Sequence, residues 1–179
     1  VEVIDNGVWT SSRSEGSLQA TILGWFPLYA DADNQMYTYY YSEIDKYAKK
    51  LTSSLYPNAI PIGDVRNVDV SKLPHIDLLI GGSPCQCFSF AGKRKGMVTK
   101  DNIEIYTLEK YLELKEQGFE FEGQSYLFWE YVRILRDIQK YNPNVKFLLE
   151  NVIMEERWRK IISQNIGIPP IRINAALVS

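Results

Sequence analysis

The stretch HIDLLIGGSPC, residues 75–85, joins a short apolar run to two glycines, a serine, a proline and a cysteine. An apolar run of this length, bounded by a turn signal, is typical of a β-strand that is buried on both faces of its sheet. Such strands occur where helices cover both faces, so the stretch predicts an α/β fold with a mostly parallel sheet.

Strand-like and helix-like segments alternate on both sides of this stretch, which supports the same fold class. Strands are predicted over 37–42, 59–65, 75–82, 145–152 and 171–178, and helices over 43–56, 106–118, 125–143 and 155–167. The apolar stripe of helix 125–143 consists of Phe128, Tyr131, Val132, Leu135 and Ile138, and that of helix 43–56 consists of Ile44, Tyr47, Ala48, Leu51 and Leu55. Thr107 is a predicted N-cap, and Gly118 a predicted helix stop.

The composition excludes several classes of protein. With 179 residues and 45% apolar side chains, the chain can bury a sizeable core. Its net charge of −2 means that any contact with nucleic acid must come from a local patch. Two cysteines and one histidine make neither a disulfide framework nor a closed zinc site, so we expect an intracellular protein without a metal. No apolar run is long enough to span a bilayer.

Polar residues follow four of the predicted strands. They are Glu43, Asp64, the Ser83–Cys85 turn and the pair Glu150–Asn151. Because the carboxyl ends of parallel strands meet at one edge of a sheet, where ligands bind, we expect these residues to form an active site.

Cys85 is the candidate nucleophile. It follows two glycines and a proline, and the basic residues Lys93, Arg94 and Lys95 come shortly after it. Nearby positive charge favours the reactive thiolate, whereas a free cysteine with a structural role is a small buried apolar residue. Cys87 is predicted to be a packing residue, since a redox or metal pair would lack further ligands.

Three acids are candidates for catalysis or binding. Glu150 ends an apolar strand, where apolar walls would let its carboxyl hold a proton near neutral pH, with Asn151 fixing its position. Its alternative role is that of a helix cap. Glu43 and Asp64 each follow a strand, where an acid can accept the ribose hydroxyls of a nucleoside cofactor or simply face solvent. The loop FSFAGKRKG, residues 88–96, could close over phosphates or be a solvated surface loop.

GGSPCQCFSFAGKRKG, residues 81–96, resembles the nucleophile motif of DNA (cytosine-5) methyltransferases of the bacterial or phage modification type. LLENV, residues 148–152, resembles their Glu-Asn-Val motif, and SEIDKYA and GDV resemble their ribose-binding and adenine-binding segments. QSYLFWEYVRIL, residues 124–135, resembles the segment that opens their next helix. The resemblance covers about residues 37–179, and it implies the three-layer Rossmann-like fold of S-adenosylmethionine-dependent methyltransferases.

The resemblance also implies a mechanism. A cytosine is flipped out of double-stranded DNA, and Cys85 adds to its carbon 6 while Glu150, next to Asn151, contacts ring nitrogen 3. Carbon 5 then takes a methyl group from S-adenosylmethionine. By the same resemblance, Glu43, Ile44, Asp64, Val65, Pro84 and Leu127 bind the cofactor. Gln86, Ser89 and Lys93 contact DNA.

The chain departs from the family pattern at both ends. The Phe-x-Gly-x-Gly loop that cradles the methionine part of the cofactor has no counterpart, since Gly7, Gly16 and Gly24 stand alone. The family continues into a Gln-x-Arg-x-Arg motif, a target recognition domain and a closing helix. We therefore expect an unassigned segment over 1–36, a catalytic core over 37–179 and no target recognition domain. We also expect this chain by itself to bind S-adenosylmethionine poorly and to methylate nothing.

Two other functions fit the same residues. A tRNA (cytosine-5) methyltransferase has this fold, nucleophile and glutamate, and a catalytically inactive binding or regulatory module could keep the fold without the glycine loop. Under the DNA-modifying hypothesis we expect a monomer in the cytoplasm of a bacterial or phage-infected cell, with no metal and no membrane contact. A restriction endonuclease is a candidate cellular partner.

Overall fold

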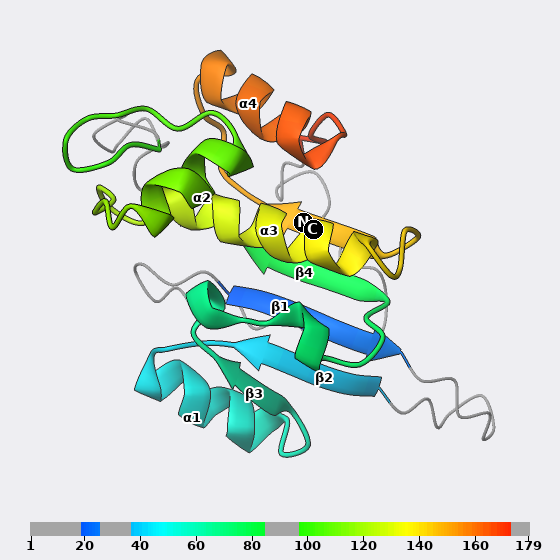
Figure 1. Ribbon diagram of the computed structural model, residues 1–179. Helices are drawn as coiled ribbons and strands as arrows, with labels where there is room; N and C mark the ends of the chain where they lie inside the picture. The colour runs from blue at the N-terminus through cyan, green and yellow to red at the C-terminus, as the bar shows by residue number, and fades with distance from the viewer. Residues whose placement is uncertain (1–18, 26–36, 85–96, 173–179) are drawn as a thin grey trace.

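A computed structural model describes residues 19–25, 37–84 and 97–172 as an α/β protein (Figure 1). The strands are β1 (Gln19–Trp25), β2 (Tyr37–Ser42), β3 (Ile60–Gly63), β4 (Leu78–Gly82) and β5 (Lys146–Glu150). The helices are α1 (Lys46–Leu55), α2 (Leu108–Glu116), α3 (Phe128–Gln139) and α4 (Glu156–Ile166). Three short 3₁₀ helices are η1 (Val65–Asn67), η2 (Val70–Lys72) and η3 (Ser125–Leu127).

The five strands form one sheet in the order β3-β2-β1-β4-β5. β2 pairs with β3 and β4 pairs with β5 in parallel, and β1 is antiparallel to both β2 and β4. Strands β2, β3, β4 and β5 therefore point in one direction, as the sequence predicts, and the central strand β1 runs against them.

Strand β1 was not predicted, because its segment has apolar residues without a clear period. Its direction has a simple physical reason. Residues 26–36 connect it to β2, and this connection is shorter than the ~12 residues that a parallel crossover requires. A connection of this length suits antiparallel pairing with β2 better than a parallel crossover.

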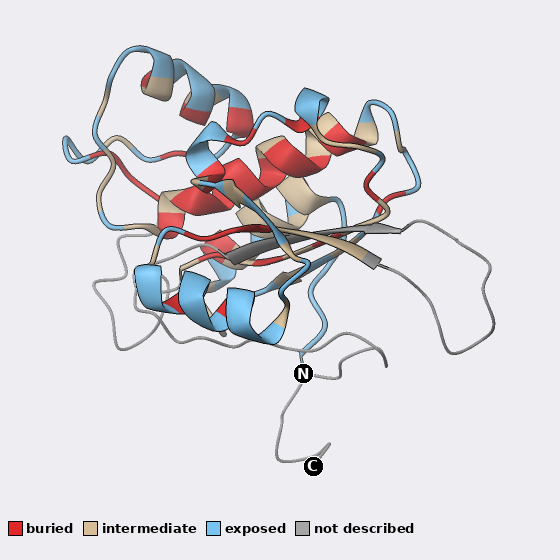
Figure 2. Cartoon of the chain, turned by 90° about the horizontal axis from the view of Figure 1, so that it is seen from below, coloured by how far each residue is buried: buried red, intermediate tan, exposed pale blue. Residues whose placement is uncertain are grey.

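Helices lie on both faces of the sheet. Tyr39 packs edge-on against Tyr56, the C-cap of α1, with ring centroids 5.8 Å apart. Tyr40 points to the other face, because side chains alternate along a strand, and it packs against the core under α3. Figure 2 shows α1 and α3 on opposite sides of the strands, with α3 largely buried and α1 largely exposed.

Two apolar cores meet at helix α3. The first core joins α3 to the sheet and to the segment after β3, and it includes Val65, Val68, Leu79, Tyr131 and Ile138. The second core lies between α2, α3 and α4, and it includes Tyr111, Leu114, Phe128, Trp129 and Trp158. Each such buried side chain contributes about 1.5–3 kcal/mol. All five residues of the stripe predicted for 125–143 are buried, which confirms it.

The helix ends agree with their sequence signals. Thr107 caps α2 by accepting a hydrogen bond from the Lys110 amide, at 3.2 Å. Gly118, one residue beyond the C-cap Gln117, has a positive φ of 79°. In α1, the N-cap is Asp45, whose Oδ1 accepts hydrogen bonds from the amides of Tyr47 and Ala48. Helix α1 thus begins at Lys46, three residues later than the predicted start.

Two apolar segments are more exposed than their sequences suggest: the stripe of helix 43–56, and the run 145–152, which also has the apolar character expected of a buried strand. In α1, Ala48 is buried, but Tyr47, Leu51 and Leu55 are exposed, so the predicted stripe does not face a core. In β5, Leu148 is exposed, so this strand is not covered on both faces. In the described sheet β5 is an edge strand, and helices α3 and α4 lie on one side of it.

The last predicted strand, 171–178, lies mostly outside the described residues. Ile171 and Arg172 are described and have no regular structure. No helix within the described part of the chain is long and apolar enough to cross a membrane.

Candidate active site

The ends of four strands lie along one edge of the sheet. Backbone pairing aligns Gly63 with Ser42, Ser42 with Ala20, Ala20 with Gly81, and Gly81 with Leu149. The residues that follow this row in the four parallel strands are Glu43, Asp64, Gly82 and Glu150. The sheet therefore brings the three acids singled out in the sequence to the same edge, next to the turn at Ser83 and Pro84.

Glu43 is held in a defined position at the end of β2. Its carboxyl is buried, with 5% of the residue exposed, and Oε1 accepts hydrogen bonds from the amides of Ile44 and Asp45 at 2.7 and 2.8 Å. The hydroxyl of Ser42 donates to the carbonyl of Gly63 at 2.7 Å, which ties this strand end to that of β3. Ile44 is exposed. The two backbone contacts fix the orientation of the Glu43 carboxyl at the edge of the sheet.

Asp64 lies at the end of β3 and caps η1. Its Oδ1 accepts a hydrogen bond from the Arg66 amide at 2.9 Å, and both oxygens accept from the Arg66 guanidinium. The hydrogen bonds from Arg66 lower the pKa of Asp64 below its ordinary value. Val65 is buried in the core beneath, so the backbone here is anchored. A ligand amine at Asp64 would share this carboxylate with Arg66.

The turn after β4 is tied to two other segments. The buried hydroxyl of Ser83 accepts a hydrogen bond from the side-chain amide of Asn151 at 2.7 Å. The hydroxyl of Ser125, in η3, donates to the carbonyl of Pro84 at 2.8 Å. Leu127, two residues further, is buried in the core with α3. These contacts fix the direction in which the chain leaves β4 toward residue 85.

Glu150 pairs with Gly82 across the parallel strands β4 and β5. A Cβ at Gly82 would lie 3.2 Å from Oε2 of Glu150, so glycine leaves room for the carboxyl at this edge. Glu150 is exposed, and the expectation of apolar walls around its carboxyl is therefore wrong for the described part of the chain. A bound base would have to supply the apolar surroundings.

Cys85, Gln86, Cys87, Ser89 and Lys93 lie outside the described residues, together with the rest of the predicted loop. The predicted roles of these residues stay predictions. The described chain reaches Pro84, and it resumes at Met97, which is fully buried in the second core.

Sequence reasoning placed Ser83 at the site but missed its hydrogen bond to Asn151. It also missed Gly82 as the neighbour of the Glu150 carboxyl and Ser125 as a hydrogen-bonding residue. The polar Ser83 directly after an apolar strand was a usable signal for a strand-end contact. Ser125 gave no signal, because its partner is 41 residues away in sequence.

The described residues offer no metal centre, since no group of three or more His, Cys, Asp or Glu side chains among them could hold a metal ion. A cleft of about 760 Å³ lies elsewhere, between residues 68–75 and the end of α3, and it is lined by Arg133, Asp137 and Tyr141 among others. None of the predicted site residues lines this cleft.

The arrangement defines an α/β protein with acids and a polar turn gathered at the carboxyl edge of its sheet. Residues 29–156 match the family model of C-5 cytosine-specific DNA methylases. This match covers more than half of the chain, and the chain belongs to that family.

Individual relatives include both phage and bacterial proteins. The chain is 44% identical over 86 residues to the orphan methyltransferase M.SPRI of Bacillus phage SPR, covering 46% of this chain and 20% of that protein. It is 29% identical over 136 residues to the type II methyltransferase M.NlaIV of Neisseria lactamica, covering 73% of this chain and 31% of that protein. It is 44% identical over 111 residues to the type II methyltransferase M1.ScrFI of Lactococcus lactis subsp. cremoris, covering 62% of this chain and 21% of that protein. The chain thus spans between about a fifth and a third of these relatives.

Proposed function

We propose that the protein is a DNA (cytosine-5) methyltransferase that uses S-adenosylmethionine and acts on double-stranded DNA. The observation that carries the proposal is the gathering of Glu43, Asp64, the Ser83–Pro84 turn and Glu150 at one sheet edge in a member of the C-5 cytosine-specific DNA methylase family. With helices on both faces, the sheet is consistent with a three-layer Rossmann-like methyltransferase fold. Because β1 belongs to this sheet, we include residues 19–25 in the catalytic core.

The described residues fit the nucleoside part of the cofactor. Glu43 and Asp64 follow the paired strand ends Ser42 and Gly63, so the two carboxyls lie on neighbouring strands. Carboxylates accept hydrogen bonds from ribose hydroxyls and from an adenine amine. We assign the ribose to Glu43, with Ile44 beside the adenine, and the adenine amine to Asp64, with Val65 beside it. Pro84 and Leu127 complete the predicted pocket.

S-adenosylmethionine, when bound, supplies a methyl group on a positively charged sulfur, which makes that carbon an electrophile. Cys85, one residue after the anchored Pro84, is the nucleophile that activates the base. Its thiolate forms a bond to carbon 6 of the cytosine, and the electron pair of the 5,6 double bond moves into the ring toward nitrogen 3.

Glu150 completes the activation. Its protonated carboxyl donates to ring nitrogen 3 and stabilises the charge that arrives there, and Asn151 keeps the carboxyl in place through the backbone and Ser83. Carbon 5 would then form a bond to the methyl group while the bond between that methyl group and the sulfur of the cofactor breaks, and the sulfur keeps the electron pair so that S-adenosylhomocysteine is the leaving group. A base removes the proton from carbon 5, the thiolate of Cys85 leaves carbon 6, and the double bond is restored.

The basic loop supplies the contact with DNA in this proposal. Gln86, Ser89 and Lys93 would contact the DNA around the flipped base. Such contacts to phosphates fix the position of the duplex, and the positive charge also favours the thiolate of Cys85.

Covalent trapping tests the proposal. The full-length protein, incubated with S-adenosylmethionine and DNA that contains 5-fluorocytosine, should form an adduct that survives denaturation, because fluorine cannot leave carbon 5 as a proton does. Cys85→Ala should abolish the adduct and Cys87→Ala should spare it. Trapping on a tRNA that contains 5-fluorocytosine, without trapping on DNA, would favour the tRNA alternative. A lack of any adduct would reject the proposed mechanism.

A further inference from the structure

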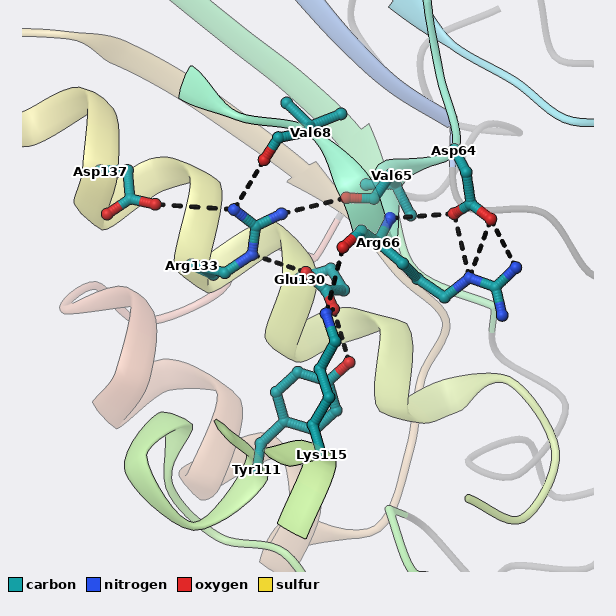
Figure 3. Close-up of polar contacts among 9 residues, drawn as sticks. All are labelled: Asp64, Val65, Arg66, Val68, Tyr111, Lys115, Glu130, Arg133 and Asp137. Atoms are coloured by element: carbon teal, nitrogen blue, oxygen red, sulfur yellow. Dashed lines mark hydrogen bonds and ion pairs between the residues drawn. The ribbon is translucent and has the colours of Figure 1, made fainter. Parts of the chain in front are cut away.

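Glu130, in α3, is a fully buried carboxylate that the proposed mechanism does not use. It accepts hydrogen bonds from the Tyr111 hydroxyl at 2.6 Å, from Lys115 Nζ at 2.5 Å and from Arg133 Nε at 2.7 Å (Figure 3). Burial, followed by the charge of Glu130, raises the pKa of Tyr111, so its hydroxyl stays protonated and donates. We name these four residues the Glu130 cluster.

The two cations of the Glu130 cluster reach the segment that follows β3. Arg133 donates from its two terminal nitrogens to the carbonyls of Val68 and Val65, at 2.9 and 3.1 Å. Lys115 donates to the carbonyl of Arg66 at 3.1 Å. Figure 3 shows these side chains extending from α2 and α3 to the segment.

These contacts hold the backbone directly next to Asp64. Three carbonyls within four residues, 65, 66 and 68, accept hydrogen bonds from cations that are themselves fixed by one buried carboxylate. The side chains of Val65 and Val68 are also buried in the core. The segment from Asp64 to Val68 is therefore held from both its side chains and its backbone.

Buried ion pairs are a poor means of gaining stability, because removing the charges from water offsets much of their attraction. Apolar residues of similar size would serve a core as well. Charged groups with several hydrogen bonds do, however, fix positions and directions more narrowly than apolar contacts. A segment that binds a ligand requires its backbone to be held in a narrowly defined position.

We propose that Glu130, Lys115 and Arg133 are positioning residues that hold the Asp64–Val68 segment in the geometry that binds the adenine of the cofactor. This inference rests on the proposed function, since it takes Asp64 as the residue that meets the adenine amine. In this proposal the cluster itself contacts neither the cofactor nor the DNA. Its effect reaches the cofactor only through the backbone of residues 65–68.

The test uses the full-length protein and two variants that change the donors in different ways. Arg133→Lys keeps a cation for Glu130 but loses the planar pair of donors to the two carbonyls. Lys115→Met removes one donor from a partly exposed side chain. Arg136→Lys is the matched control, because Arg136 lies on the same helix but pairs with Glu109 at the surface.

The first readout is the affinity for S-adenosylhomocysteine, measured by calorimetric titration well below the melting temperature. We expect the Kd to rise about tenfold in Arg133→Lys, and somewhat less in Lys115→Met, with no change in Arg136→Lys. The kcat at saturating S-adenosylmethionine should stay within about threefold of the wild type, since the groups at the cytosine are untouched.

The second readout does not need the cofactor. Hydrogen exchange of the amides of residues 65–68 should speed up about tenfold in both variants and stay unchanged in the control. In an Asp64→Asn background, Arg133→Lys should add little to the loss of affinity, because both changes act on the same contact.

The outcomes separate the inference from the proposed function. If the wild type binds S-adenosylhomocysteine and neither variant changes the Kd, the inference is wrong and the function stands. A change in melting temperature with an unchanged Kd also overturns the inference, because the cluster is then structural only. If the wild type shows no affinity for S-adenosylhomocysteine, the cofactor assignment fails, and the inference fails with it.

Discussion

The side-chain amide of Asn151 donates a hydrogen bond to the hydroxyl of Ser83, with 2.7 Å between Nδ2 and Oγ. The contact joins the residue that follows β5 to the residue that follows β4. Glu150 directly precedes Asn151, and Cys85 comes two residues after Ser83. The bond therefore fixes the two strand ends that carry the proposed acid and the proposed nucleophile.

Removing this bond should affect both stability and rate. We expect Asn151→Ala to lower the free energy of unfolding by about 1 kcal/mol, since Ser83 is buried and loses its partner. The methylation rate should fall about tenfold, because the two strand ends are no longer held together. Urea denaturation and transfer of a labelled methyl group measure the two effects. Asn144→Ala, at an exposed turn, is the control, and a rate equal to the wild type would exclude a positioning role.

Replacing the proposed acid should leave the fold intact. Glu150→Gln keeps the size and hydrogen-bonding reach of the side chain, but it removes the proton that ring nitrogen 3 receives. We expect the methylation rate to fall by roughly two or more orders of magnitude, the usual effect of losing an acid catalyst. Glu116→Gln, at an exposed position of α2, should have no effect. A rate within about threefold of the wild type would make Glu150 a structural residue.

Adding one methyl group at Gly82 should act through Glu150. The new Cβ would lie 3.2 Å from Oε2, which is closer than a normal contact, so the carboxyl must shift. We expect Gly82→Ala to lower the methylation rate about tenfold with little loss of stability, because the end of a flexible side chain can move. In a Glu150→Gln background, Gly82→Ala should lower the methylation rate almost no further. Equal effects of Gly82→Ala in both backgrounds would contradict this explanation.

The pair Asp64–Arg66 predicts a specific dependence of stability on pH. Because hydrogen bonds from Arg66 lower the pKa of Asp64 below 3.8, the ionised carboxylate stabilises the fold above that pH. This contribution is lost as the pH falls through the lowered pKa. The free energy of unfolding of the wild type should exceed that of Arg66→Gln by about 0.2–1 kcal/mol at pH 6, the range for exposed pairs. The difference should shrink steadily as the pH falls below 3.8 and through the lowered pKa of Asp64.

Urea denaturation over a pH series measures this difference, and carbon NMR of Asp64 gives its pKa directly. Lys50→Gln, at an exposed position of α1, controls for the loss of one positive charge. A difference that stays constant down to pH 2 would show that Arg66 acts by packing and not through the carboxylate.

Much of the fold could be predicted from local sequence patterns. Strands β2 to β5 and helices α1 to α4 all fall inside the predicted segments, because apolar spacing and caps such as Thr107 are local signals. Strand β1 could not be predicted. It has no clear period, and its place depends on pairing with β4, about 60 residues away in sequence.

Burial was harder to predict than secondary structure. The stripe of α1 has helical spacing, yet Tyr47, Leu51 and Leu55 are exposed. A period shows which side chains share a face, and it does not show what packs against that face. Leu148 lies in the apolar strand β5 and is also exposed, so the apolar run did not show what covers its side of the strand.

At the candidate site, the acids were predictable because each follows an apolar strand. The contacts that hold them were not. Glu130 is a charged residue in an amphipathic helix, and such a residue normally faces solvent. Its burial follows from Tyr111 and Lys115 on another helix, which no local pattern reveals.

The central position of β1 has a mechanical consequence. Within the described sheet, β1 alone connects the half that carries Glu43 and Asp64 to the half that carries Ser83 and Glu150. Ala20 faces both Ser42 and Gly81, so the alignment of the two halves depends on the register of a single strand. A slip of two residues on one side would move one half past the other by about 7 Å. Catalytic constellations are held to within about 0.5 Å. Under the proposed function, the register of β1 would therefore align the half of the sheet that binds the methyl donor with the half that binds the cytosine.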